Sequence, residues 1–294
     1  MDKAYQAAIK KIEKAKSENA TTLSLANLGL KTIPDELWTL TNLEVLHLNN
    51  NRITTLPSEI RQLQKLTQLH LYRNRLVEVP NDMGSLAKLK ELHIGDNSLE
   101  AIPDGIDALK SLVKLLFDYN KLTAIPDSIG NLALLEVLDV GYNEITHLPS
   151  SLADLQNLVE LKLHGNQIVE IPGCIDQLEN LLVLDMDGNQ LKQIPNSLGN
   201  LKNLIVLDLC YNSLSKIPTE IGNLPRLEVL NLGYNRIKKI PTSLANLSNL
   251  AQNEPDQTYK EYGFYIEGNP IKLPHHVRIK EPDEIIEFIL EQQG

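Results

Sequence analysis

The chain repeats itself every 23 residues over most of its length. Asparagine recurs at this interval, at Asn51, Asn74, Asn97, Asn120, Asn143, Asn166, Asn189, Asn212 and Asn235. Proline keeps step with it, at Pro34, Pro57, Pro80, Pro103, Pro126, Pro149, Pro172, Pro195, Pro218 and Pro241. Two columns that stay in register over so many rows indicate a repeat architecture, in which each unit buries its apolar side chains against its neighbours.

Each repeat follows the pattern LxxLxLxxNxIxxIPxxIxxLxx. Leucines at alternate positions, such as Leu46 and Leu48, point to one face of a short strand and form the core. The asparagine ends the strand with an amide that both donates and accepts, which predicts a ladder of amides between rows. Proline then starts a return segment whose apolar residues recur every third position, a spacing that favours 3₁₀ or polyproline-like turns.

This pattern resembles the leucine-rich-repeat family over residues 23–274. Its 23-residue form, with Ile-Pro in most rows, is similar to the intracellular Ras-group type that occurs in Roco-type proteins and bacterial effectors. The resemblance implies an α/β solenoid of horseshoe shape, with a parallel β-sheet on its concave face and 3₁₀ or short turns on its convex face. It also implies that the concave face binds a protein. We expect eleven repeats.

Both ends of such a solenoid need a cover, because an open end exposes leucines. Residues 1–22 are predicted to hold an N-terminal cap helix, since Ile9 and Ile12 lie on one apolar stripe at helical spacing. Residues 275–294 are predicted to hold a C-terminal cap helix that starts near Pro282. We therefore expect helical caps at both ends.

The last repeat is irregular. The asparagine expected at position 258 comes at Asn269, so residues 251–262 are predicted to form an insert that projects as a loop. The run GNPIKLPHHVRIKEPDEIIEFIL is similar to the segment that ends the repeat array of Roco proteins before their GTPase domain. The sequence contains no G-x-x-x-x-G-K-[ST] motif, so GTPase activity is not expected.

Composition narrows the classes of partner. The net charge of -10 disfavours nucleic acid and anionic membrane surfaces, both of which attract basic proteins. No apolar stretch approaches the ~20 residues that span a bilayer, and the N-terminus lacks the apolar region of a secretory signal. Cys174 and Cys210 have no metal or redox spacing, which fits a reducing compartment. We expect a cytoplasmic monomer, or a protein delivered into a host cell if its source is a pathogen.

The candidate binding residues lie on the outward side of the strands. The column four positions before each asparagine holds His47, His70, His93, Leu116, Asp139, Lys162, Asp185, Asp208, Asn231 and Tyr265. Three histidines on successive strands invite a zinc interpretation, but side chains on the first and third strands start roughly 10 Å apart, which strains three bonds to one ion. A polar binding surface is the preferred interpretation, so no metal and no cofactor are predicted.

Acidic and aromatic residues extend this surface. Asp118 and Asp187 add to the acidic column, which is either a solvated face or a complement to a basic partner; both interpretations stay open. Tyrosines stand beside the asparagine column at Tyr72, Tyr119, Tyr142, Tyr211 and Tyr234. Each ring either packs on the neighbouring turn or anchors a partner. Gly165 and Gly188 take the same position in the rows between Tyr142 and Tyr211, which leaves a notch there.

The sequence shows no nucleophile, base and phosphate-loop pattern, and Cys210 has no adjacent general base in the repeat columns. We therefore predict that the protein is not an enzyme. The main hypothesis is a non-catalytic scaffold whose concave face binds a partner protein, and that partner carries a basic patch. The alternative is a regulatory leucine-rich-repeat module of a signalling system, either Roco GTPase-like or a host-targeted bacterial effector.

Overall fold

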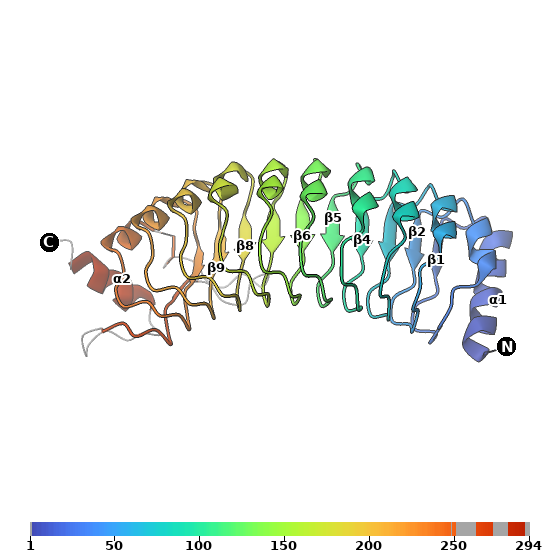
Figure 1. The fold of residues 1–294 in the computed structure, drawn as a ribbon, viewed down its shortest axis with the longest axis horizontal. Coiled ribbons are helices and arrows are strands. Elements are labelled where there is room, and N and C mark those ends of the chain that lie inside the picture. The colour runs from blue at the N-terminus through green and yellow to red at the C-terminus, as the bar shows by residue number, and fades with distance from the viewer. Residues whose placement is uncertain (1, 248, 251–262, 273–281, 292–294) are drawn as a thin grey trace. The chain divides into compact units, whose positions relative to one another are not determined.

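The computed structural model describes residues 2–247, 249–250, 263–272 and 282–291. These residues form two units, Met1–Glu144 and Ile145–Gly294. In each unit every turn of the chain carries one short strand and one short helix, and the helices stack along one side (Figure 1).

The first unit starts with helix α1 and holds six strands. Its helix and strands are α1 Lys3–Ser17, β1 Thr22–Ser24, β2 Val45–His47, β3 Gln68–His70, β4 Glu91–His93, β5 Lys114–Leu116 and β6 Val137–Asp139. Its 3₁₀ segments are η1 Asp35–Thr39, η2 Ser58–Gln62, η3 Asn81–Ser85, η4 Asp104–Ala108 and η5 Asp127–Asn131. The strands pair in parallel in sequence order.

The second unit repeats this plan and ends with helix α2. Its strands and helix are β7 Glu160–Lys162, β8 Val183–Asp185, β9 Val206–Asp208, β10 Val229–Asn231, β11 Gly263–Tyr265 and α2 Pro282–Glu291. Its 3₁₀ segments are η6 Ser150–Asp154, η7 Gly173–Gln177, η8 Asn196–Asn200, η9 Thr219–Asn223 and η10 Thr242–Asn246. These strands are also parallel and in sequence order. The eleven strands and the 3₁₀ turns confirm the predicted solenoid class.

The strand register follows the repeat, with one exception. Leu46 pairs with Leu69, 23 residues on, and the other strands within each unit keep this step as far as β10. Leu230 of β10 pairs instead with Phe264 of β11, so the sheet continues across the longer last repeat. The predicted insert, residues 251–262, lies outside the described residues, and its loop conformation stays a prediction.

The predicted asparagine ladder is confirmed. The buried Asn189 side chain donates from Nδ2 to the carbonyl oxygens of Leu163 at 3.0 Å and Met186 at 3.1 Å. Its Oδ1 accepts from Ile168 N at 3.0 Å. Asn269 makes the same kinds of bond in the last repeat, so it is the ladder residue of that repeat despite its displaced position. Each amide thus satisfies buried backbone groups of two successive rows.

Proline and the residue before each ladder asparagine set the two turns of the repeat. The ten prolines of the repeat column, Pro34 to Pro241, take φ between -61° and -73°, and each precedes a 3₁₀ segment. The position before the ladder residue is left-handed in every row, with φ from 47° at Tyr211 to 72° at Gly268. Four tyrosines occupy this left-handed position: Tyr119, Tyr142, Tyr211 and Tyr234. The repeat pattern did not predict that conformation, because tyrosine disfavours it.

Helices pack on both terminal rows. Helix α1 lies against β1 and η1 and buries Ala8, Ile12 and Ala15. Helix α2 lies against η10 and β11 and buries Ile285 and Ile289. Each helix covers apolar side chains that a neighbouring repeat would otherwise bury. None of the helices in the described ranges has the length and apolar character needed to cross a membrane.

Candidate functional site

The candidate site is the open sheet face, defined as the residues two, four and six positions before each ladder asparagine. The alternate positions in each strand point into the core, as Leu184 and Leu207 do with no exposed surface. The open sheet face is held at one strand spacing by the ladder, so its side chains form fixed rows. The two units present different chemistry on it.

In the first unit, imidazole and phenol rings gather into a histidine surface made of His47, His70, Tyr72 and His93. The rings of His47 and His70 stack with centroids 4.6 Å apart, and those of Tyr72 and His93 stack at 4.3 Å. The rings of His70 and His93 meet edge-on at 6.4 Å. Rings that pack on one another form one continuous surface rather than a set of converging ligand atoms.

The pKa values of two of these histidines are lowered. Burial is the main cause for both, and the neighbouring His47 lowers the pKa of His70 further. The Nε2 atom of His93 lies 3.7 Å from Asp118 Oδ1, and this carboxylate opposes the lowering of the His93 pKa only in part. Since the net change is downward from 6.5, His93 is mainly neutral at pH 7, and its contact with Asp118 is a polar contact rather than a full ion pair.

Beside the histidine surface lies a cavity of about 580 Å³. Its lining residues are Tyr72, Arg73, His93, Gly95, Asp96, Asp118 and Tyr119. Arg73 and Asp96 lie 3.6 Å apart on its exposed edge, with charges of both signs. Tyr119 stacks on Tyr142 with ring centroids 4.2 Å apart. This mixed lining selects no single sign of charge.

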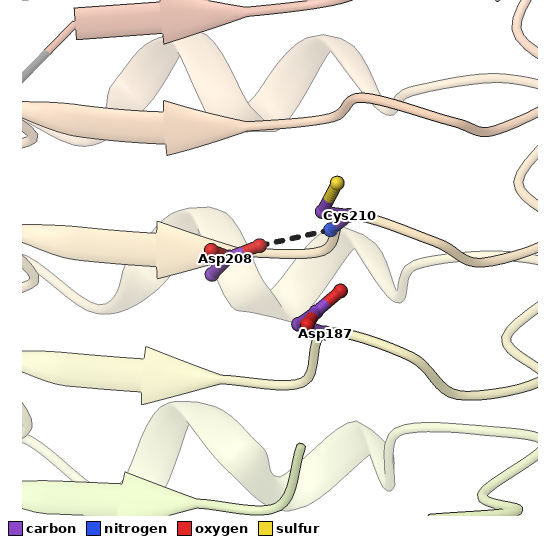
Figure 2. A group of neighbouring side chains, drawn as sticks. All are labelled: Asp187, Asp208 and Cys210. Carbon is purple, nitrogen blue, oxygen red and sulfur yellow. Dashed lines mark hydrogen bonds between the residues drawn. The ribbon is translucent and has the colours of Figure 1, made fainter. Parts of the chain in front are cut away.

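In the second unit, carboxylates gather around Cys210. Ligand-type atoms of Asp187, Asp208 and Cys210 all lie within 4.8 Å of one another, and Figure 2 shows the three side chains at the ends of adjacent strands. Asp208 Oδ1 accepts from Cys210 N at 2.9 Å, and its Oδ2 accepts from Asn231 Nδ2 at 3.1 Å. The Oδ1 atom of Asp187 is buried and accepts no hydrogen bond. The cluster is therefore short of donors.

The pKa values in this cluster reflect that shortage. Burial raises the pKa of Asp208 to about 6, and the charges of Asp185 and Asp187 add to the rise. Burial also raises the pKa of Asp187, again with help from Asp185. The pKa of the Cys210 thiol rises to about 12, through burial and the nearby carboxylates. The thiol is thus protonated at neutral pH, which does not suit a nucleophile.

These carboxylates border a second cavity, called the acidic cavity here, of about 280 Å³. Its lining residues are Asp187, Asp208, Cys210, Tyr211, Asn231, Gly233, Tyr234, Tyr265 and Glu267. Tyr211 and Tyr234 stack with centroids 4.4 Å apart and planes 2° apart. Both rings are about half exposed, at 56% and 44%. None of the described lining residues is basic.

A row of valines lies on the same face, at the opposite ends of these strands. Val183, Val206 and Val229 pack together, and the half-buried Leu182 and Ile205 pack against them. In the first unit the same column is mixed, with Val45 and Val137 on either side of Gln68, Glu91 and Lys114. Along β8 and β9 the open sheet face therefore runs from apolar to acidic.

The structure brings the sequence-predicted residues together in two groups. His47, His70, His93, Tyr72, Asp118, Asp139, Tyr119 and Tyr142 lie in the first unit, and Lys162, Asp185, Asp187, Asp208, Tyr211 and Tyr234 lie in the second. Lys162 Nζ contacts Glu160 at 2.8 Å, and His164 Nδ1 lies 3.0 Å from Asp185 Oδ2. The column is thus less uniformly solvated than the sequence indicates.

Several residues of this face were not singled out from the sequence. They are the valine row, Glu267, and Cys210 as a neighbour of the carboxylates. Their spacing from the ladder residues does place all of them, because each falls two, four or six positions before a ladder asparagine. A search restricted to charged and aromatic residues passes over the valines.

Comparisons with known proteins place the chain in a family. A family model described as "Leucine-rich repeat region" matches residues 23–120 and 114–209, and one described as "Leucine rich repeat" matches residues 202–252. No curated protein sequence matches the chain. The two models together cover more than half of the chain.

Solved structures share the fold. A TDR receptor is 26% identical, with a TM-score of 0.78 over 88% of this chain, which spans 45% of that receptor. A leucine-rich-repeat protein of Leptospira interrogans is 26% identical, with a TM-score of 0.57 over 95% of this chain and 97% of its own.

The ectodomain of the Arabidopsis thaliana receptor kinase GASSHO1/SCHENGEN3, solved in complex with Casparian strip integrity factor 2, is 30% identical. Its TM-score is 0.66 over 83% of this chain, which spans 32% of that ectodomain. Proteins of this repeat class are generally non-catalytic interaction modules. The 23-residue rows, the ladder and the matched models agree: the chain belongs to the leucine-rich-repeat family.

Proposed function

We propose that this protein is a non-catalytic scaffold that binds a partner protein through its open sheet face. The observation that carries the proposal is the composition of that face in the second unit, where a valine row spans β8, β9 and β10 and half-buried carboxylates follow it on β8 and β9. The exposed, stacked rings of Tyr211 and Tyr234 border these carboxylates. Tyrosine anchors beside desolvated charge are typical of the energetic centres of protein interfaces. The plant receptor ectodomain solved with Casparian strip integrity factor 2 supports it by likeness of fold.

The proposed partner presents a basic patch to the open sheet face. Asp185, Asp187 and Asp208 lie within two adjacent rows, so a basic segment would meet several carboxylates at once. The valine row would contact an apolar residue of the same segment. Charge complementarity of this kind sets specificity and the rate of association more than total affinity.

The test compares two pairs of isosteric substitutions. Asp185→Asn with Asp208→Asn removes charge from the open sheet face, whereas Asp154→Asn with Glu179→Gln removes the same charge from exposed positions at the 3₁₀ side of the same unit. A partner captured from a lysate and identified by mass spectrometry is then titrated by calorimetry. We expect the first pair to weaken binding about tenfold or more and the second to leave it unchanged.

Equal affinity for both pairs, with equal melting temperatures, would show that the open sheet face of the second unit is only solvated surface. The reversal Asp185→Lys with Asp208→Lys is a harsher second variant. It needs a thermal melt beside it, since Asp208 is more buried than an outward column position indicates.

A regulatory module of a signalling system is the second proposal. The Ile-Pro form of the repeat resembles the Ras-group and Roco-type arrays, and the run after Gly268 is similar to the end of the Roco array. Co-purification of the chain with a GTPase or ligase from its native source would support this over a free-standing scaffold. A cytoplasmic location belongs to the same proposal, and the free thiols of Cys174 and Cys210 are in keeping with a reducing compartment.

A further inference from the structure

The acidic cavity is lined by negatively charged side chains and by aromatic rings. Three carboxylate side chains, from Asp187, Asp208 and Glu267, are among its lining residues. The stacked rings of Tyr211 and Tyr234 stand at its edge, and Tyr265 lines it as well. An aromatic face attracts a cation through its quadrupole, and a carboxylate attracts it by charge, so both kinds of wall select the same sign.

The hydrogen-bonding balance of the cavity points the same way. Asp208 accepts from Cys210 N and Asn231 Nδ2, yet burial and the neighbouring charges still disfavour its ionised form. Asp187 keeps a buried Oδ1 atom that accepts no hydrogen bond. A buried carboxylate oxygen without a donor is costly. A ligand that brings several N–H donors and one positive charge would satisfy both residues.

The size and chemistry of the cavity favour an organic cation over a bare metal ion. Its volume of about 280 Å³ would hold several water molecules, at about 30 Å³ each. A guanidinium is planar, stacks on aromatic rings and donates to two carboxylates at once, which matches the parallel tyrosine pair and the two aspartates.

We propose that the acidic cavity is a binding site for one arginine side chain, seated between the carboxylates of Asp187 and Asp208 and the edge formed by Tyr211 and Tyr234. This deepens the proposed function by naming the group that is recognised, and it rests on that function for the source of the arginine. The arginine belongs to a basic segment of the partner. The valine row of the same strands is placed to contact the apolar residues of that segment.

The test needs no knowledge of the partner. The full chain, with ¹³C-labelled tyrosine rings, is titrated with N-acetyl-arginine methylamide and followed by NMR. The neutral isostere N-acetyl-citrulline methylamide is the matched ligand control, and the single substitutions Tyr211→Phe and Tyr234→Phe assign the signals. We expect saturable shifts at Tyr211 and Tyr234 with arginine, and affinity for citrulline lower by about tenfold or more, as for loss of a charged hydrogen bond.

Protein variants provide the second control. Asp187→Asn and Asp208→Asn should each weaken arginine binding about tenfold, while Asp154→Asn, at an exposed position of η6, should leave it unchanged. Equal shifts with citrulline would overturn the proposal. Shifts of Tyr119 and Tyr142 as large as those of Tyr211 and Tyr234 would also overturn it, because they would mark unspecific surface binding.

Two further outcomes separate this inference from its neighbours. If ZnCl₂ or CaCl₂ shifts these rings and arginine does not, the cluster is a metal site and the proposal is wrong. If the Asp185 and Asp208 substitutions weaken partner binding but the arginine probe does not bind, the proposed function is supported and the arginine site is wrong. If the probe binds in the acidic cavity but the Asp185 and Asp208 substitutions leave partner binding unchanged, the arginine site is supported and the proposed function is wrong.

Discussion

Tyr211 and Tyr234 stack with ring planes 2° apart, although both residues hold a left-handed backbone, with φ of 47° and 51°. For a residue other than glycine, asparagine or aspartate that conformation costs about 1–2 kcal/mol. Gly165 and Gly188 occupy the same position in adjacent rows, so the repeat itself does not require a side chain there. Stacking contributes about 0.5–1.5 kcal/mol. The rings thus offset the strain of the backbone that presents them.

We predict that Tyr211→Gly changes the free energy of unfolding by less than about 1 kcal/mol, because relief of the left-handed backbone balances the lost stack. The same substitution should weaken binding of the arginine probe, since it removes part of the aromatic wall. Urea unfolding and the NMR titration measure the two effects. A large loss of stability would mean that the tyrosine pair is mainly structural.

We predict that Asn189→Ala destabilises the protein by about 2–4 kcal/mol. The substitution removes three contacts donated by Nδ2 and one accepted bond, and it leaves buried backbone groups of two rows without these partners. Asn180→Ala is the control, because Asn180 makes one exposed bond from Nδ2 to Gln156 O. Chemical denaturation of both variants measures the difference. Similar values for both would contradict a ladder that holds the rows together.

We predict that Asp208→Asn stabilises the protein at pH 7.5 and not at pH 3.5. The pKa of Asp208 is raised from 3.8 to about 6 in the folded state, so ionisation costs stability as pH rises through this range and costs nothing below it. A rise of this size in the pKa corresponds to about 3 kcal/mol, and the lost bond from Asn231 reduces the gain to about 1–2 kcal/mol. Thermal melts across this pH range check it. A variant that is less stable at every pH would contradict it.

We predict that the histidine surface makes the first unit sensitive to acid. The pKa values of His70 and His93 lie below their ordinary 6.5, so the stability they contribute is present above pH 6.5 and is lost as pH falls through the folded-state pKa values. The charged groups that act on the two rings are His47, Glu91, Asp118 and Asp139.

The double substitution His70→Gln with His93→Gln should therefore lose less stability between pH 7.5 and pH 5 than the native chain. Denaturant unfolding at both pH values gives the comparison. An unchanged pH slope would show that protonation of these two rings has no cost in the folded state.

Repetition made the fold predictable from sequence, because the ladder and the strand register depend only on spacing. Asn189 could be assigned its role from its column alone, and Asn269 from the pattern of the residues around it. The raised pKa of Asp208 could not be predicted in this way, since it depends on burial by the folded rows and on the charges of Asp185 and Asp187. The left-handed tyrosines were also beyond prediction, because there tertiary packing overrides the preference of the residue.

Leu230 and Phe264 pair on neighbouring strands although they lie farther apart in the sequence than the 23 residues that separate the other paired leucines. The strands β10 and β11 remain neighbours although the chain between them is longer than in any other described repeat. Extra residues at this point leave the geometry of the open sheet face untouched, and Tyr265 and Glu267 still reach the acidic cavity. We therefore expect this junction to accept a segment of different length or sequence, beside the side chains that line the acidic cavity, at a small entropic cost.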